Sequence, residues 1–104
     1  MIRTELYFGL TRPGGADITD AEFELFLDEV VSPRFPAGHT ILAAQGRWRE
    51  QSGRLRKEAS RVLVVLHPAD ERANRQLEEI RQLYKTRFAQ EAVLRVDGIE
   101  KVAF

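Results

Sequence analysis

The sequence contains two histidines, His39 and His67, whose spacing places them in one hairpin. Their positions are symmetric about Gly53, in the predicted turn, so their side chains are expected opposite each other. Arg3, at the start of the first predicted strand, and Asp97, at the end of the last, are expected at one edge of the sheet. Two imidazoles and a carboxylate can bind a divalent metal or transfer protons. A structural role at two strand ends explains both histidines more simply, and we predict no metal site.

A second group of polar side chains lies on the first and last predicted strands. Arg3, Glu5 and Tyr7 alternate along the first strand, and Arg95 lies on the last. Alternate residues on neighbouring strands share a face, so two arginines, a carboxylate and a phenol are predicted within reach of each other. The arginines can bind a carboxylate or phosphate through paired hydrogen bonds. Alternatively, Glu5 pairs with an arginine of the same or a second copy, which leaves no group for a ligand. Together with His67, these four residues are the ligand-binding candidates.

The segment 47–61 is rich in basic side chains around the only tryptophan. Arg47 and Arg49 flank Trp48, and the segment carries six basic residues against two acidic ones. Basic groups beside an aromatic ring favour an anion or single-stranded nucleic acid. The next predicted strand offers no ring for a base and the net charge is zero, so nucleic acid is not the expected partner. Residues 17–29 hold six acids and no base, so self-association explains the basic segment equally well.

Hydrophobic periodicity predicts the elements that position these side chains. Apolar residues at alternate positions from 2 to 8 indicate a strand. Thr19 and Glu22 form a capping box at the start of a helix with apolar spacing up to Val31, and Pro33 is expected to end this helix. The other predicted elements are strands over 39–48 and 61–66 joined by a flexible tip at 50–58, a helix over 69–88, a strand over 93–96 and a short tail strand within 98–104.

This order predicts an α+β, ferredoxin-like βαββαβ domain, a four-stranded antiparallel sheet with two helices on one face. The residues expected to face the helices are Thr4, Leu6, Phe8, Val62, Val64, Leu66, Leu94 and Val96. The residues expected on the opposite face are Arg3, Glu5, Tyr7, Leu63, Val65, His67, Val93, Arg95 and Asp97. That face mixes apolar and charged groups, which is typical of a wet exterior, a dimer interface or the floor of a ligand cleft. Its apolar centres favour a covering partner.

Composition narrows the possible functions. The 104 residues fit a single domain, 1–104, and 16 basic residues balance 16 acidic ones, so no overall field attracts nucleic acid or anionic lipid. The absence of cysteine excludes thiolate nucleophiles, zinc ribbons and iron–sulfur clusters, and no cofactor is predicted. The longest apolar run, Val62 to Leu66, is too short to cross a bilayer, so no membrane partner is expected. No signal peptide precedes the first strand, which predicts a cytoplasmic protein, or an exported one if a leader has been removed.

Four segments carry a resemblance to a known family. They are RTELYFG from Arg3, PRFPAG from Pro33, QGRW from Gln45, and YKTRF followed by QE from Tyr84. Together they resemble an uncharacterised bacterial family, domain of unknown function 3574, from Arg3 to about Asp97. The resemblance implies no activity and no catalytic residues, because none are established for that family. Some members carry an export signal, which this sequence lacks.

Three functional hypotheses follow. The first is a small homodimerising domain that binds a small ligand on its open sheet face, beside Arg3, Glu5, Tyr7 and His67. The second is a small enzyme of the dimeric α+β barrel type, with His67 or Glu5 as general base in a cavity between sheet and partner. The third is an anion or single-stranded nucleic-acid binder that uses the 47–61 hairpin.

Overall fold

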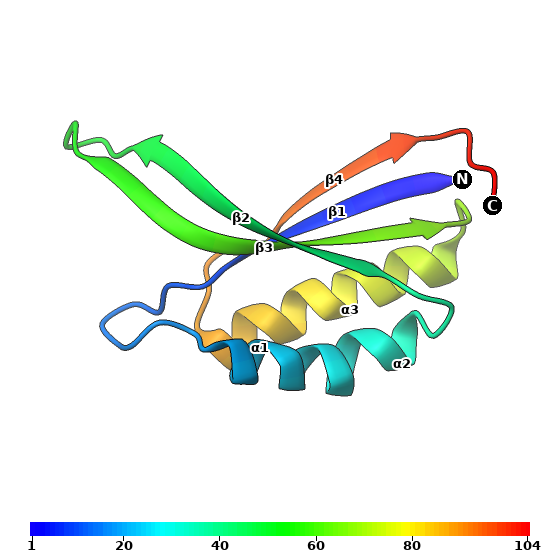
Figure 1. The fold of residues 1–104 in the computed structure, drawn as a ribbon, viewed down its shortest axis with the longest axis horizontal. Coiled ribbons are helices and arrows are strands. Elements are labelled where there is room, and N and C mark those ends of the chain that lie inside the picture. Colours follow the sequence, from blue (N-terminus) through cyan, green and yellow to red (C-terminus); the bar gives the residue numbers. More distant parts are fainter.

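A computed structural model describes all residues from 1 to 104. The elements are β1 (Ile2–Gly9), α1 (Asp20–Phe26), the π-helical turn η1 (Leu27–Val31), α2 (Ser32–Arg34), β2 (Thr40–Arg49), β3 (Leu55–His67), α3 (Glu71–Phe88) and β4 (Leu94–Ile99). The strands form one antiparallel sheet in the order β2-β3-β1-β4, and all helices cover one of its faces (Figure 1). The predicted ferredoxin-like α+β fold is therefore confirmed. The other face of the sheet, called the open face below, carries no helix.

The first helical segment begins as predicted but ends later. The Thr19 side chain accepts the backbone N–H of Glu22, and the Glu22 carboxylate accepts that of Thr19, each at 3.1 Å, which confirms the capping box. Pro33 does not end the helical path, which was a wrong prediction. The path widens into η1, where Ser32 N–H donates to the carbonyl of Leu27, and Pro33 then lies at the start of α2, where its missing N–H is tolerated.

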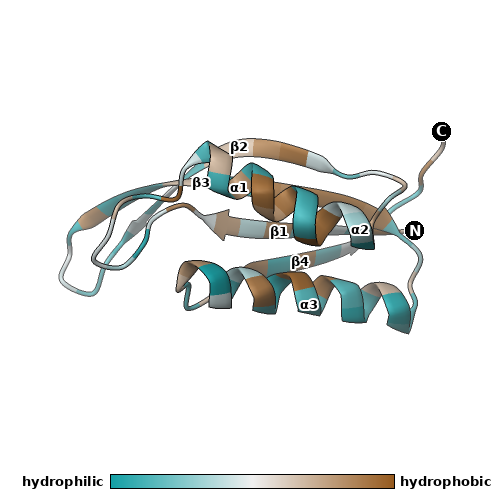
Figure 2. Ribbon diagram, turned by 90° about the horizontal axis from the view of Figure 1, so that it is seen from below, coloured by the Kyte–Doolittle hydropathy of each residue, from teal (hydrophilic) through white to brown (hydrophobic).

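Aromatic rings from β1, α1 and α3 form the centre of the core. The Phe8 ring centroid lies 4.5 Å from that of Tyr84 on α3, and Phe26 of α1 lies 5.1 Å from Tyr84. The Tyr84 hydroxyl donates to the carbonyl of Gly9 at 2.6 Å, so this fully buried phenol is satisfied. Hydrophobic positions recur along α1 and α3 between hydrophilic ones (Figure 2), and their buried stripes meet the sheet.

The strand register corrects the predicted face of β3. Leu6 pairs with Leu63 and Thr4 with Val65, and directly paired residues share a face. Leu63, Val65 and His67 therefore lie on the helix side. The sequence favoured the opposite assignment because Val62–Leu66 is apolar on both faces, so alternation there selects neither register. Val62, Val64 and Leu66, which were expected toward the helices, lie on the open face.

The register of β4 is also shifted by one residue from the prediction. Leu6 pairs with Arg95 and Thr4 with Asp97, which places the two charged side chains on the helix side. Leu94 and Val96 consequently lie on the open face, with 58% and 44% of their surfaces exposed. Val93, expected on the open face, precedes the strand and is fully buried in the core.

The remaining boundaries differ from expectation in length. β2 and β3 form a long hairpin that extends past the helices (Figure 1), and its tip spans only 50–54, because β3 already begins at Leu55. β4 continues through Asp97 and Gly98 to Ile99, and 100–104 form no strand, so the predicted tail strand is absent. None of the helices is both long and apolar enough to cross a membrane.

Candidate functional site

The open face presents apolar side chains around a polar centre. Leu42 of β2 is 48% exposed there, and Val62 and Val64 of β3 lie between it and β1. Glu5 and Tyr7 of β1 lie on the same face, beside the exposed Leu94 and Val96 of β4. Val62 is buried among these neighbours, whereas Leu42 of β2, Leu66 of β3 and Leu94 and Val96 of β4 leave hydrophobic surface uncovered on this face.

Arg3, Glu5 and Tyr7 form a hydrogen-bonded row on this face, as their alternation predicted. The Tyr7 hydroxyl donates to Oε1 of Glu5 at 2.9 Å, and Nη2 of Arg3 donates to Oε2 at 3.0 Å. These two interactions, from Tyr7 first and Arg3 second, lower the pKa of Glu5, and the same hydrogen bond raises the pKa of Tyr7. Glu5 is therefore an ionised, fully engaged carboxylate and a weak proton acceptor at neutral pH.

A cavity of about 270 Å³ opens on this face beyond Tyr7. Two glycines create its space. A Cβ on Gly9 would lie 3.0 Å from the carboxylate of Glu58, and a Cβ on Gly46 would lie 3.3 Å from the indole of Trp48. The two side chains thus lie directly against glycine backbone, and Tyr7 closes the cavity from β1.

Glu58 is the residue at this cavity that the sequence analysis missed. It is half-buried, and the arginines around it have other partners: Arg56 pairs with Glu50 at 3.8 Å and Arg61 with Asp20 at 3.0 Å. Glu58 was assigned to a flexible tip, although it lies two residues before Ser60 and four before Val62 and so shares their face. Gly46, its direct partner in the register, was the available signal, because a glycine inside a strand often marks a close approach.

His67 lies on the helix side of the sheet, away from this cavity. Its Nε2 lies 2.7 Å from Oγ1 of Thr4, whose hydroxyl is 2.6 Å from a carboxylate oxygen of Asp97. Hydrogen bonds from Thr4 and Arg95 lower the pKa of Asp97 although burial opposes this, so the carboxylate accepts and the Thr4 hydroxyl donates to it. Thr4 Oγ1 must then accept from Nε2–H of His67.

The second ring nitrogen completes this assignment. Nδ1 of His67 lies 2.7 Å from the carbonyl oxygen of Pro68, which can only accept. Both ring nitrogens of His67 are therefore engaged with protein oxygens. Neither nitrogen is free to act as a general base on a ligand.

The two histidines are not opposite each other, which corrects a prediction. Thr40 pairs with Val64, so His39, just before β2, lies beside Val65 in the register rather than beside His67. Arg3 and Asp97 lie at one edge of the sheet as expected, in the adjacent pairs Arg3–Gly98 and Thr4–Asp97, but their side chains lie on opposite faces. No group of three or more His, Asp or Glu side chains is arranged to hold a metal ion.

Arg95 does not join the row of Arg3, Glu5 and Tyr7. Its guanidinium contacts Glu78 and Asn74 of α3 at 3.0 Å and Asp97 at 3.1 Å on the helix side. These contacts raise the pKa of Arg95 despite its partial burial. Arg95 therefore joins the edge of the sheet to α3.

Arg47, Trp48 and Arg49 are divided between the two faces. Trp48 pairs with Arg56 on the open face, and the Arg56 guanidinium lies 5.9 Å from the indole centroid, whereas Arg47 and Arg49 project from the other side of β2. The three residues do not form one continuous surface for a nucleic acid. Several acids in 17–29 pair within the chain, Glu22 with Arg12 and Glu29 with Arg87 among them.

Comparison with known proteins gives a fold relative but no curated relative. No curated protein matches the chain. A phage SAM lyase in complex with S-methyl-5'-thioadenosine is similar in structure, with a TM-score of 0.67 and 17% sequence identity over 93% of this chain and 79% of that one. The phage SAM lyase in its apo state gives a TM-score of 0.67 and 16% identity over 93% and 78% of the two chains. At this identity, the likeness concerns the fold alone.

The family model described as a protein of unknown function (DUF3574) matches residues 3–104. That match spans all the segments on which the resemblance rested. This chain therefore belongs to the DUF3574 family.

Proposed function

We propose that this chain is a small-molecule-binding domain that acts as a homomer. A second copy covers the open face, and the ligand, a flat heterocycle with a positive charge, lies in the cavity over Gly9 and Gly46. The observation that carries the proposal is Glu58, a half-buried carboxylate without an ion-pair partner, in a cavity that the rings of Tyr7 and Trp48 also line.

The chemistry of the cavity favours a cation over an anion. An unpaired carboxylate loses hydration as its surroundings close, and a ligand cation restores the lost interaction. Aromatic faces attract cations through the ring quadrupole and also stack on flat heterocycles. Ser60 and Gln90 add polar groups to the cavity, while Leu94 provides an apolar side. A rim of this composition is typical of a small-molecule site.

The orientation of β4 supports a second copy as the cover. This strand turns its charged residues, Arg95 and Asp97, toward the helices and its apolar residues, Leu94 and Val96, outward. In a monomer that orientation exposes hydrophobic surface to water at a cost, whereas a covering partner buries it. A net charge of zero imposes no overall repulsion between two copies.

The fold relative suggests a specific pair of probes. S-methyl-5'-thioadenosine, the molecule held by the phage SAM lyase, is a neutral adenosine thioether. S-adenosylmethionine joins the same adenosine to a positively charged sulfonium. The two molecules share the flat base and differ in the sulfonium and the amino-acid arm that it carries, so the Glu58 variant is needed to assign a difference in affinity to the positive charge.

Isothermal titration of the purified protein with both molecules tests the proposal. The charged ligand is expected to bind more tightly, and Glu58→Gln should weaken its binding about tenfold, the loss of one charge-assisted contact, with little effect on the neutral ligand. Glu24→Gln, an exposed acid of α1 away from this cavity, is the matched control and should leave both affinities unchanged. Absence of binding, or equal loss for both ligands in Glu58→Gln, would contradict the proposal.

The second candidate function is an enzyme acting on such a cation, favoured by the fold of the phage SAM lyase. The two predicted bases do not fit this role, because Tyr7 and Arg3 hold Glu5, and both ring nitrogens of His67 are engaged with protein oxygens on the helix side. Glu58 is the carboxylate with no competing ion pair. Chromatographic detection of S-methyl-5'-thioadenosine after incubation with S-adenosylmethionine, lost in Glu58→Gln, would support catalysis, whereas binding without turnover would restrict the protein to the first function.

A further inference from the structure

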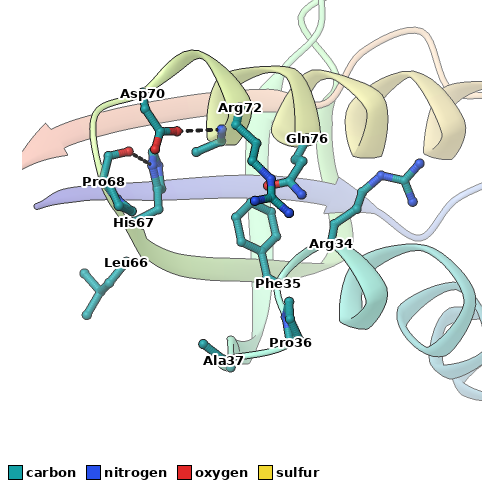
Figure 3. A pocket seen from close by; sticks show the side chains of 12 residues that line it. Arg34, Phe35, Pro36, Ala37, Leu66, His67, Pro68, Asp70, Arg72 and Gln76 are labelled. Atoms are coloured by element: carbon teal, nitrogen blue, oxygen red, sulfur yellow. Dashed lines mark hydrogen bonds between the residues drawn. The ribbon is translucent and has the colours of Figure 1, made fainter.

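A second cavity, of about 310 Å³, lies on the helix side of the sheet and is separate from the open-face cavity. It is formed where the end of β3, the loop after α2 and the first turns of α3 meet (Figure 3). The side chains of Phe35 and Pro36 give it an apolar wall, whereas Leu66 borders it with its backbone, since its side chain lies on the open face. The side chains of Arg72 and Gln76 extend from α3 toward the loop that carries Phe35 (Figure 3).

Arginines outnumber acids around this cavity. Its lining contains Arg34 and Arg72, and the only carboxylate among its residues is Asp70. Asp70 is already engaged, since it accepts the backbone N–H of Ala73 at 2.8 Å as the cap of α3. His67 also lines the cavity, but both of its ring nitrogens are engaged with protein oxygens.

The two guanidinium groups differ in how far they are engaged. Arg34 donates to the carbonyl of Val30 at 2.9 Å and lies 3.5 Å from Glu79, while its buried Nε makes no hydrogen bond. Arg72 has neither a hydrogen-bond partner nor an ion-pair partner, and its group lies at the cavity. Arg72 is therefore the free donor at this cavity, whereas the charge of Arg34 is shared with Glu79.

We propose that this cavity binds a small organic anion, a monocarboxylate with an apolar body. Arg72 binds the carboxylate through its planar pair of N–H donors, and the apolar body lies against Phe35 and Pro36. A carboxylate fits better than a fully hydrated inorganic anion because one side of the cavity is apolar. This cavity shares no lining residue with the open-face cavity, so the test of this proposal does not depend on the proposed function.

Benzoate is the probe, and benzylammonium, of similar size and opposite charge, is its control. Each is titrated at constant ionic strength into isotope-labelled full-length protein while the amide signals of Phe35, His67 and Ala73 are followed by NMR. Benzoate should cause saturable shifts confined to the residues around the cavity, and benzylammonium should cause none.

Two arginine variants on the same helix locate the binding group. Arg72→Gln should raise the dissociation constant for benzoate about tenfold, as expected for the loss of a charge-assisted pair. Arg75→Gln, an exposed arginine outside this cavity, should leave the constant unchanged. Both replaced side chains are exposed, so both variants should retain the wild-type amide spectrum elsewhere. Shifts that never saturate, equal responses to the two probes, or undiminished binding in Arg72→Gln would overturn the proposal.

Discussion

The two faces of the sheet differ in how far their polar groups are hydrogen-bonded and their apolar groups are covered. On the helix side, most buried polar groups have partners, as in the Tyr84 hydroxyl on the Gly9 carbonyl and the chain from His67 through Thr4 to Asp97; Arg34 Nε and His39 Nδ1 are the exceptions. On the open face, Leu94 is more than half exposed and Glu58 has no ion pair. The apolar groups of the helix side are thus covered within one chain, whereas the open face gains contacts when something covers it.

This contrast separates stability from binding. The aromatic core, the capped helices and the charged edge of β4 all lie on the helix side, so most of the free energy of folding arises there. The open face contributes one partly covered layer of side chains and a cavity. Substitutions on the two faces should therefore affect different measurements.

The largest expected effect is on the core. Phe26→Ala removes a fully buried ring that contacts Phe8, Tyr84 and Phe88, and should lower the free energy of unfolding by about 3–5 kcal/mol. Leu66→Ala on the open face, where 39% of the side chain is exposed, should cost about 1 kcal/mol or less in the monomer. Urea unfolding followed by circular dichroism measures both. Equal losses would remove the distinction between the faces.

The next effect concerns the polar chain at the edge of the core. Thr4→Val keeps the shape of the side chain but leaves Nε2–H of His67 and the Asp97 carboxylate without their shared partner. The expected loss is about 1–3 kcal/mol in the free energy of unfolding. Thr86→Val, an exposed threonine of α3, is the control and should change stability much less. If Thr4→Val were as stable as the wild type, the hydrogen bonds from His67 through Thr4 to Asp97 would not hold β1 to its neighbouring strands.

A smaller effect should appear in acid. Burial alone would raise the pKa of Asp97, but hydrogen bonds from Thr4 and Arg95 and the charge of His67 lower it below its ordinary value of 3.8. Ionised Asp97 therefore stabilises the fold above that value, and the contribution is lost as the pH falls below it. Asp97 is largely exposed, so the change should stay under about 1 kcal/mol.

Asp97→Asn tests this acid dependence by unfolding at several pH values. The variant should lose less stability below pH 4 than the wild type, with Asp28→Asn, an exposed acid of η1, as control. A variant that follows the wild-type acid profile would show that the Thr4–Asp97 bond contributes nothing in solution.

The substitution with the smallest effect on folding stability should have the clearest effect on assembly. Leu94→Glu places a charge on the open face and should change monomer stability by about 0.5 kcal/mol or less, since the side chain is already exposed. It should nevertheless convert the homomer to a monomer in light scattering. Leu25→Glu replaces a leucine of α1 that is 55% exposed, and it should leave the molar mass in solution unchanged. A wild-type protein that is monomeric at high concentration would contradict the proposed cover.

The order of elements and the capping box could be predicted because each has a local signal. Alternation marks β1, the Thr19–Glu22 pair marks the start of α1, and a helical stripe marks α3. The faces of β3 and β4 could not be predicted in the same way. β3 is apolar on both sides, and β4 reverses the usual rule by turning Arg95 toward Glu78 on α3, a contact between residues 17 apart.

The candidate site was predicted only in part. Tyr7 and Trp48 were identified, but in two separate hypotheses, because their meeting at one cavity depends on the pairing of β1, β3 and β2. Glu58 was missed because the turn of the hairpin is shorter than the polar composition of 50–58 indicated. His67 was assigned to the wrong face with the rest of β3. Residue types were visible in the sequence, and their neighbours were set by register.

At Gly9, the last residue of β1, only a single layer of backbone separates the two faces of the sheet. Its carbonyl accepts the Tyr84 hydroxyl on one side, and its Cα borders the Glu58 carboxylate on the other. The only tryptophan of the chain, Trp48, lies beside the same glycine's cavity. All three Tyr and Trp chromophores of the protein therefore lie around one point: the indole of Trp48 and the phenol of Tyr7 border the cavity, and Tyr84 lies on the inner side. Indole fluorescence can report an occupant directly, and near-ultraviolet dichroism of a Tyr7→Phe variant, in which Tyr84 is the only tyrosine, can report whether that occupancy reaches the interior.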